Sequence, residues 1–265
     1  MAILFKENFE NGNLGGFKIN GLPPTVATEQ ARVGTHCMKS YLAATEKRAE
    51  VSLSKIQDAV IGYGYWYGFS IFLLKPFEVN SAWESVANWH ARPDFDIGET
   101  WRSAPMSLNT AHPKSPFPDA EWILPVRWDS RKLSDLPVEG EDWYSLGPYE
   151  TGVWTDWVFH VKWSYESDGF LEVWKNGVKV LARDGPNCYN DEYGPYFKMG
   201  IYRAGRSAGA PRTIYHDEFR MADANGTYED VAPGGKSPEP KPPISGTAKI
   251  IINIPATQIT VIKES

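Results

Sequence analysis

Three short segments of the chain carry side chains whose types complement one another chemically. Arg48-Ala-Glu-Val51 supplies a guanidinium, Asn88-Trp-His90 supplies an amide and an imidazole, and the segment 196–203 (YFKMGIYR) supplies an ammonium and two phenols. If all of them face one concave sheet, the set suits removal of a proton from a carbon next to a carboxylate. The guanidinium and the amide would neutralise that carboxylate and the negative charge that develops during the reaction. The imidazole or a phenolate would take the proton, and a phenol would give one to the leaving oxygen.

A β-strand lets the segment 196–203 present such a set, because successive side chains of a strand point to opposite faces. One face would be apolar and would join a core through Phe197, Met199 and Ile201. The opposite face would carry two phenols, an ammonium and a residue without a side chain, namely Tyr196, Lys198, Gly200 and Tyr202. We therefore expect this strand to form a wall against which a polar ligand lies.

The elements that position these segments read as strands along most of the chain. Short alternating stretches are separated by Gly, Pro, Asn and Asp, and amphipathic helices of about 12 or more residues are absent from the pattern. The clearest stretches are 49–53, 66–74, 157–164, 171–174, 178–181, 196–202 and 213–221. The pattern predicts an all-β fold, a sandwich or jelly roll.

Two further features concern the connections between strands. Asn176-Gly177 predicts a two-residue hairpin turn, because both turn positions need positive φ. The Pro-rich stretch 91–148 holds few clear strands. Long loops on a rigid sandwich commonly arrange binding, so we expect this stretch to select the ligand.

The chain divides into three parts by composition. Residues 1–232 form the predicted sandwich, residues 233–246 (PGGKSPEPKPPISG) read as a linker rich in Pro and Gly, and residues 247–265 read as a short β tail. The tail is too short to bury a core alone. It would pair with the main sheet, pair with another chain, or be the start of a further module.

Composition narrows the class of partner. Aromatic residues make up 14% of the chain, with 11 Trp, 13 Tyr and 12 Phe. Flat rings pack in strands and also line carbohydrate clefts, so we expect about six to ten rings to face a ligand. The formal net charge of −6 argues against nucleic acid as the main partner, and a local basic cleft would still accept an acidic ligand.

The location of the protein is expected to be extracellular. No run of about 18 apolar residues is present to span a membrane. The first residues (MAILFKENFE) lack the basic start and apolar core of a signal peptide. Either a signal has been removed, or export occurs by another route such as a virion or lysis. The two cysteines, Cys37 and Cys188, are too few for a disulfide scaffold, and one bridge or two free thiols are equally compatible with the sequence.

The three segments together resemble the signature motifs of jelly-roll polysaccharide lyases. RAEV, NWH and YFKMGIYR are similar to the alginate-lyase patterns Arg-(Ser/Thr)-Glu-Leu, Gln-(Ile/Val)-His and Tyr-Phe-Lys-Ala-Gly-x-Tyr-x-Gln. The surrounding stretches WHARPD, SAPMSL, WVFHVKWSYESDGFLEVWKNGVKVL and TIYHDEFRMA resemble glucuronan-lyase and heparin-lyase-I-like proteins. The resemblance extends over about residues 5–222 and implies β-elimination at a uronic acid in an acidic polysaccharide.

The resemblance also implies a role for individual residues. His90 would be the base for the C5 proton or an aid to it, and Tyr202 would protonate the O4 leaving group. Arg48 and Asn88 would neutralise the C5 carboxylate. The remaining expected roles concern substrate binding: Gly200 would allow close approach of a sugar, and the other contacts are expected from Lys198, Arg203, Tyr196, Trp89, Arg92 and Arg102. No cofactor is expected to be required for catalysis.

The chain departs from the alginate-lyase pattern at Asn88, which replaces a longer Gln, and at Arg203, which replaces the final Gln. Other readings therefore stay open. A lectin on the same sandwich would bind sugar without cleaving it, and a glycoside hydrolase would need paired carboxylates, for which the nearest candidates are Asp94 and Asp96. His160 is the alternative base. Related sandwiches also raise a structural Ca²⁺ held by Asp217 and Glu10.

Overall fold

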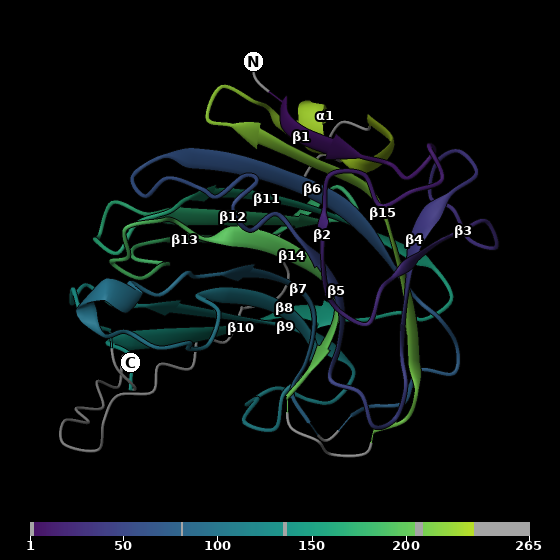
Figure 1. Ribbon diagram of the computed structural model, residues 1–265, viewed down its shortest axis with the longest axis horizontal. Coiled ribbons are helices and arrows are strands. Elements are labelled where there is room, and N and C mark those ends of the chain that lie inside the picture. Colours follow the sequence, from purple (N-terminus) through teal and green to yellow (C-terminus); the bar gives the residue numbers. More distant parts are fainter. Residues whose placement is uncertain (1–2, 81, 135–136, 205–208, 236–265) are drawn as a thin grey trace, which may run out of the picture.

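The structure, a computed structural model, describes residues 3–80, 82–134, 137–204 and 209–235. Two antiparallel sheets pack face to face as a sandwich (Figure 1). The first sheet has eight strands, ordered β13 (Val178–Asp184), β12 (Phe170–Lys175), β11 (Trp154–Lys162), β6 (Gly64–Leu73), β15 (Arg212–Asp223), β4 (Cys37–Leu42) and β3 (Thr25–Ala27), with β1 (Ile3–Glu7) paired to β15. The predicted all-β jelly roll is confirmed.

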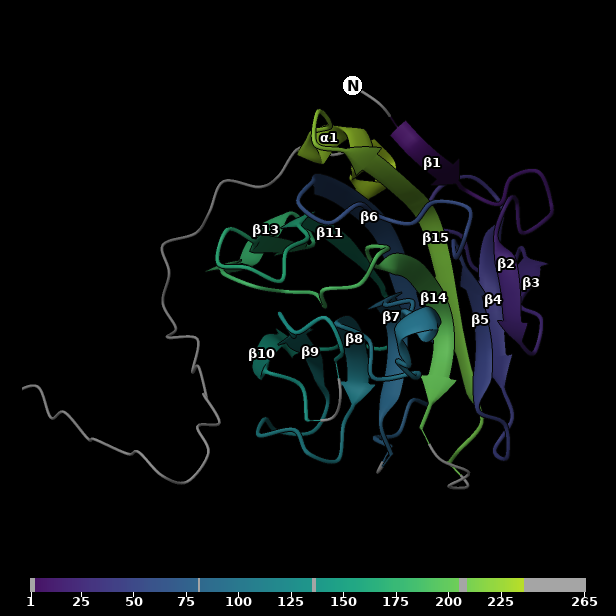
Figure 2. The same cartoon turned by 60° about the vertical axis from the view of Figure 1, so that its left-hand side comes forward.

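The second sheet has seven strands and carries the three segments. Its order is β10 (Gly140–Pro148), β9 (Glu121–Trp128), β8 (Met106–Ala111), β7 (Glu84–His90), β14 (Tyr196–Arg203), β5 (Arg48–Ser52) and β2 (Lys18–Gly21). Figure 2 shows β14, β7 and β8 next to one another in this layer. The segments that the sequence singles out are therefore three adjacent strands, β5, β14 and β7, away from both edges of the sheet.

The core between the sheets explains the alternation in β14. Phe197, Met199 and Ile201 are each at most 1% exposed, and the Phe197 ring stacks on Phe219 of the other sheet with ring centroids 4.6 Å apart. Burying such side chains contributes about 1.5–3 kcal/mol each, which fixes the register of the strand. The opposite face of β14 is thereby turned toward the concave side of the sheet.

The strands expected from the sequence are present, with one correction. Asn176 and Gly177 have φ of 51° and 85° and form the predicted hairpin turn. The stretch 91–148, however, contains three strands, β8, β9 and β10, where few were expected. β8 and β9 are buried on both faces for most of their length, and β9 includes Pro125, so alternation gives little signal there.

The C-terminal part of the described chain closes one side of the first sheet. A one-turn helix, α1 (Tyr228–Val231), is capped by Thr227 and Asp230 and packs on β6 at Gly68, where a Cβ would lie 1.9 Å from the Val231 carbonyl oxygen. The 3₁₀ turn η2 (Pro233–Gly235) belongs to this folded unit although the sequence places it in the linker. The rest of the predicted linker and the predicted tail, 236–265, lie outside the described residues.

The two cysteines are both free and buried. Among the described residues, no helix has the length and apolar character needed to cross a membrane.

Candidate active site

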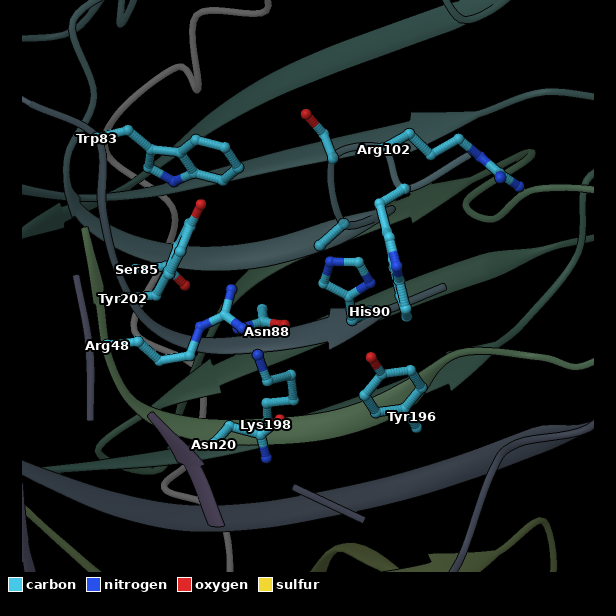
Figure 3. A pocket seen from close by; sticks show the side chains of 13 residues that line it. Asn20, Arg48, Trp83, Ser85, Asn88, His90, Arg102, Tyr196, Lys198 and Tyr202 are labelled. Atoms are coloured by element: carbon cyan, nitrogen blue, oxygen red, sulfur yellow. The ribbon is translucent and has the colours of Figure 1, made fainter. Parts of the chain in front are cut away.

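The three adjacent strands bring their polar faces into one register. Tyr202 of β14 pairs with Arg48 of β5, and Lys198 and Tyr196 of β14 pair with Asn88 and His90 of β7. These side chains converge in Figure 3, where Arg48, Asn88 and Lys198 lie between Tyr202 on one side and His90 on the other. The predicted juxtaposition of the three segments is what the fold produces.

The converging side chains line a cavity of about 610 Å³ on the concave sheet. Seven of the ten residues predicted for the site line it: Arg48, Asn88, His90, Arg102, Tyr196, Lys198 and Tyr202. The sequence did not single out the other lining residues, which are Asn20, Trp83, Ser85, Trp101, Ser103 and Ala104. The lining therefore includes four Trp and Tyr rings among the described residues, fewer than the sequence-based expectation.

Glu50 holds the polar wall of the cavity together from beneath. Its carboxylate is 1% exposed, and its Oε2 lies 2.7 Å from Lys198 Nζ and 2.9 Å from Arg48 Nε. Its Oε1 accepts a hydrogen bond of 3.1 Å from the Asn88 amide. One buried carboxylate thus orients the guanidinium, the ammonium and the amide, which is how a buried charge is kept paired.

Asn88 is fixed by this contact. Because its NH₂ group donates to Glu50, its Oδ1 is turned the other way, and that buried oxygen has no hydrogen-bond partner among the described residues. A buried unsatisfied carbonyl is costly in the absence of a ligand. The side chain therefore offers an incoming sugar an acceptor as well as the remaining N–H.

His90 is held in the tautomer of a base. Its Nδ1–H donates to the Ala91 carbonyl oxygen at 2.8 Å, so the lone pair is on Nε2. Burial lowers the pKa of His90 to about 4, and the positive charges of Lys198, Arg48 and Arg102 act in the same direction. The ring is neutral at physiological pH and able to accept a proton.

Tyr202 is positioned by contacts on two sides of its ring. The Arg48 guanidinium lies over the ring at 4.6 Å, and the Trp83 ring meets it edge-on at 5.9 Å. Trp83 is itself anchored by a hydrogen bond of 3.1 Å from its Nε1 to Asn109. The phenol is half-buried and opens on the cavity, so it is able to exchange a proton with a bound molecule.

Two other groups on β14 complete this face. Burial raises the pKa of Tyr196 to about 12, and its ring stacks on His90 with centroids 5.8 Å apart. Burial also lowers the pKa of Lys198, against the opposing influence of Glu50. Tyr196 therefore stays a neutral phenol that supports the imidazole.

Two residues predicted to bind substrate lie in the interior of the protein. Trp89 is 0% exposed and packs in the core against Phe159, because it alternates with Asn88 and His90 along β7. Arg203 is also 0% exposed and pairs with Glu84 at 3.0 Å. Neither side chain reaches the cavity, so both assignments are wrong.

The two remaining cationic candidates are neutralised by their neighbours. Arg92 bonds to Asp58 and does not line the cavity. Arg102 lines it, but the guanidinium is paired with Glu99 at 2.9 Å and with Asp191, and it points away from the other labelled side chains in Figure 3. Because these arginines are paired, the cleft is less positive than the number of cationic residues in the sequence implies. The sequence does not reveal such pairings.

Gly200 has a different role from the expected one. Its φ is 131°, and a Cβ at this position would lie 2.3 Å from the Ala49 carbonyl oxygen and 2.6 Å from the Glu50 Cα. The missing side chain therefore makes room for β5 rather than for a sugar.

Two residues reach the cavity through irregularities that the sequence does not show. Ser85 lies at a β-bulge of β7, where the pairing with β8 shifts between Ser85 and Ala87. Trp101 comes from the loop that follows β7 and is 60% exposed. The high aromatic content predicts further rings at the site, and it does not say which of them face the ligand.

The alternative base and the expected calcium ligands are engaged elsewhere. His160 lies on β11 in the other sheet, stacked on Trp66 at 3.8 Å. The carboxylate of Asp217 accepts backbone N–H groups of Arg32, Val33 and Glu218. Glu10 likewise accepts the N–H groups of residues 35 and 36. Both carboxylates are engaged with these backbone donors, and the expected calcium ion stays a prediction.

Comparison with protein families gives one match. A family described as polysaccharide lyase matches residues 9–220, which include all the strands of the cavity. No curated protein matches the sequence.

Solved structures share the fold at low sequence identity. An endo-β-1,4-glucuronan lyase from the fungus Trichoderma reesei is 18% identical with a TM-score of 0.69, covering 88% of this chain and 99% of that one. The alginate lyase AlyC3 is 12% identical with a TM-score of 0.54, covering 71% and 75%. The catalytic domain of a glycoside hydrolase family 131 protein from Coprinopsis cinerea is 14% identical with a TM-score of 0.55, covering 86% and 97%. Since hydrolases and lyases both occur on this sandwich, the likeness establishes the fold alone.

Proposed function

Because this chain belongs to the polysaccharide lyase family, we propose that it cleaves a uronic-acid-containing polysaccharide by β-elimination. The electron pair of the C5–H bond becomes the C4=C5 double bond, and the C4–O4 bond breaks with its electrons going to O4. The C5 proton goes to a base of the protein, and an acid of the protein gives a proton to O4. The observation that carries the proposal is that a neutral imidazole, a phenol and a guanidinium line one cavity.

Arg48 is the residue that we assign to the uronate carboxylate. Among the five cationic residues that the sequence assigned to the site, Arg48 has the most exposed side chain, at 38%. The other values are 14% for Arg92, 4% for Lys198, 3% for Arg102 and 0% for Arg203. Neutralising the carboxylate makes the C5 proton more acidic, and a fixed guanidinium stabilises the charge that develops on it. Lys198 adds positive potential from below, and the Asn88 N–H that is not bonded to Glu50 can donate to the carboxylate.

His90 and Tyr202 share the proton transfers. The Nε2 lone pair of His90 takes the C5 proton, and the phenol of Tyr202 delivers its proton to O4. His90 is suited to the first step because its ring is uncharged, and Tyr202 to the second because its hydroxyl opens on the cavity. The Tyr202 phenolate then regains a proton from solvent or from His90.

The alternative of hydrolysis is disfavoured by the chemistry of the cavity. Hydrolysis of a glycosidic bond needs two carboxyl groups flanking it. Among the described residues that line the cavity, none is Asp or Glu. Asp94 accepts the Glu192 N–H at 3.0 Å with both oxygens, and Asp96 lies in the 3₁₀ turn η1 (Phe95–Ile97), outside the concave sheet.

The test is the ultraviolet absorbance of the new conjugated double bond. We would incubate the protein with a panel of glucuronan, alginate, hyaluronan and heparan, beginning with glucuronan because that is the polymer named for the fungal lyase with the same fold. We expect absorbance to rise with at least one polymer. Flat traces across the panel would refute the proposal, and binding without product would favour the lectin reading.

Variants of the cavity sharpen this test. Tyr202→Phe removes the acidic proton and keeps the ring, so kcat should fall about 100- to 10,000-fold. Tyr41→Phe is the matched control, since Tyr41 is 52% exposed on β4 of the other sheet and should keep full activity. If Tyr202→Phe were as active as Tyr41→Phe, the tyrosine would have no part in the proton transfer.

A further inference from the structure

Exposed aromatic rings gather at the His90 end of the cavity. Phe95 is 55% exposed, Trp101 is 60% exposed and Tyr193 is 45% exposed, whereas most rings of the sandwich are buried. Phe95 and Trp101 come from the loop after β7, and Tyr193 from the loop before β14. The short coil of η1 marks this place at the left end of β7 and β14 in Figure 1. We call these three side chains the aromatic rim.

The rim is continuous with the cavity. Trp101 lines the cavity and its ring meets the His90 ring edge-on, with centroids 5.5 Å apart and an angle of 73°. Phe95 lies beyond it, at 5.6 Å from Trp101 and an angle of 69°. A polysaccharide with one sugar unit beside His90 would therefore meet these rings as it leaves the cavity.

The two loops that carry the rim are tied together. Asp94 accepts the Glu192 backbone N–H, and the Asp94 N–H donates to Glu99 at 2.8 Å. Arg102 bonds to Glu99 from one loop and to Asp191 from the other. These contacts lie directly beside Phe95 and Tyr193 in the chain. They hold both loops in place before a ligand arrives, which lowers the ordering cost of binding.

Tyr193 is fixed from below as well. The guanidinium of Arg92 lies 4.7 Å from the centre of its ring, and Arg92 is held by Asp58. Large rings presented to water by anchored loops mark a binding surface rather than a defect of the core. Flat rings of this kind match the apolar C–H faces of sugars.

The charges around the rim indicate the kind of contact. Asp96 and Glu192 are exposed there, whereas the two arginines nearby are paired with carboxylates. Attraction of a polyanion is therefore not what the rim supplies. We infer that the aromatic rim is a further subsite, where sugar units of the polysaccharide outside the bond-breaking cavity stack on Phe95, Trp101 and Tyr193. The inference rests on the proposed function, because it takes the occupant to be the same polymer chain.

The experiment compares long and short substrates. With glucuronan, or with whichever polymer of the panel the protein cleaves, we would measure kcat/KM for the polymer and for the shortest oligosaccharide that is still cleaved. Tyr193→Ala and Phe95→Ala should each lower kcat/KM for the polymer about three- to tenfold and leave the shortest substrate unchanged. The same loss should persist at high salt, because stacking is not screened. Tyr193→Phe should behave as the wild type.

Tyr41→Ala serves as the control, because Tyr41 is similarly exposed but lies on the other sheet. Unfolding midpoints show that each variant is folded. Equal losses for long and short substrates, or losses no greater than those of Tyr41→Ala, would overturn the subsite while the lyase activity stands. Absence of cleavage by the wild-type protein on every polymer would instead refute the proposed function itself.

Discussion

Replacement of Glu50 by Gln is the change that probes the polar wall of the cavity most directly. The substitution keeps the shape of the side chain and removes its charge. In the wild type, the carboxylate is 1% exposed and lies 2.7 Å from Lys198, which is itself 4% exposed in its side chain. Glu50→Gln therefore leaves a buried ammonium without its counter-charge, and whichever way the new amide turns, its NH₂ group faces another donor.

The size of the effect follows from this burial. Breaking a buried ion pair by removing one partner costs about 3–5 kcal/mol. Lys198 can reduce the loss by giving up its proton. Burial already lowers the pKa of Lys198 while Glu50 raises it, so the pKa falls further in the variant. A lysine with a lowered pKa in the folded state binds fewer protons than in the unfolded state, and the free energy of unfolding then rises with pH.

The free energy of unfolding that Glu50→Gln loses relative to the wild type should therefore be largest at neutral pH. The loss should shrink as pH rises from the lowered pKa of Lys198 in the folded state toward its unfolded value of about 10.4. Urea unfolding at about pH 7 and pH 9.5 measures it. We also expect kcat/KM to fall, because Arg48 and Asn88 lose the contact that orients them.

The matched control is Glu29→Gln. Glu29 pairs with Lys39 at 2.6 Å, but its side chain is 47% exposed, so this change should cost about 0–1 kcal/mol. If Glu50→Gln were no less stable than Glu29→Gln, or if its deficit did not change with pH, Glu50 would not be the residue that holds the ammonium in place.

Three other expectations concern single residues. His90 should be charged only below its pKa of about 4, so the acid limb of kcat/KM should lie near pH 4. A limb near 6.5 would contradict either the lowered pKa or the role of His90 as the base. Gly200→Ala should lose several kcal/mol in thermal or urea unfolding, because its Cβ would lie 2.3 Å from the Ala49 carbonyl oxygen; Gly62→Ala, with φ of 90° and no atom within 4 Å, should lose only about 1 kcal/mol. Arg203→Ala should lower the free energy of unfolding by about 1–3 kcal/mol, because Glu84 loses one buried partner and keeps Arg212 at 3.3 Å. KM of the folded enzyme should stay unchanged, and a raised KM would restore Arg203 to substrate binding.

The part of the site that could be predicted is the part that strand alternation decides. Phe197, Met199 and Ile201 must face the core, so Tyr196, Lys198 and Tyr202 must face away from it. The same rule should have excluded Trp89 and Arg203, because alternation places both of them on the core-facing side of their strands. Their inclusion came from their place within motifs rather than from the pattern.

The rest depended on tertiary pairing, which a single sequence does not contain. The ion pair of Arg102 with Asp191 joins residues 89 positions apart in the chain, and that of Lys198 with Glu50 joins residues 148 apart. Such pairs decide which cations are free to meet a ligand. The buried strands β8 and β9 escaped detection for a related reason, since a strand covered on both faces shows no alternation.

The position of β14 inside its sheet makes its register hard to change by mutation, whereas the neighbouring loop 91–104 is less constrained. β14 is bonded along both edges, to β5 and to β7, so a shift of one residue would break two ladders and send Tyr202 into the core. The loop 91–104, by contrast, is anchored to its neighbours largely through the carboxylates of Asp94, Glu99 and Asp191. Under the proposed function, exchange of this loop should alter which polymer is accepted, while Arg48 and Tyr202 keep their places on β5 and β14. A protein engineer could therefore change the substrate without changing these residues.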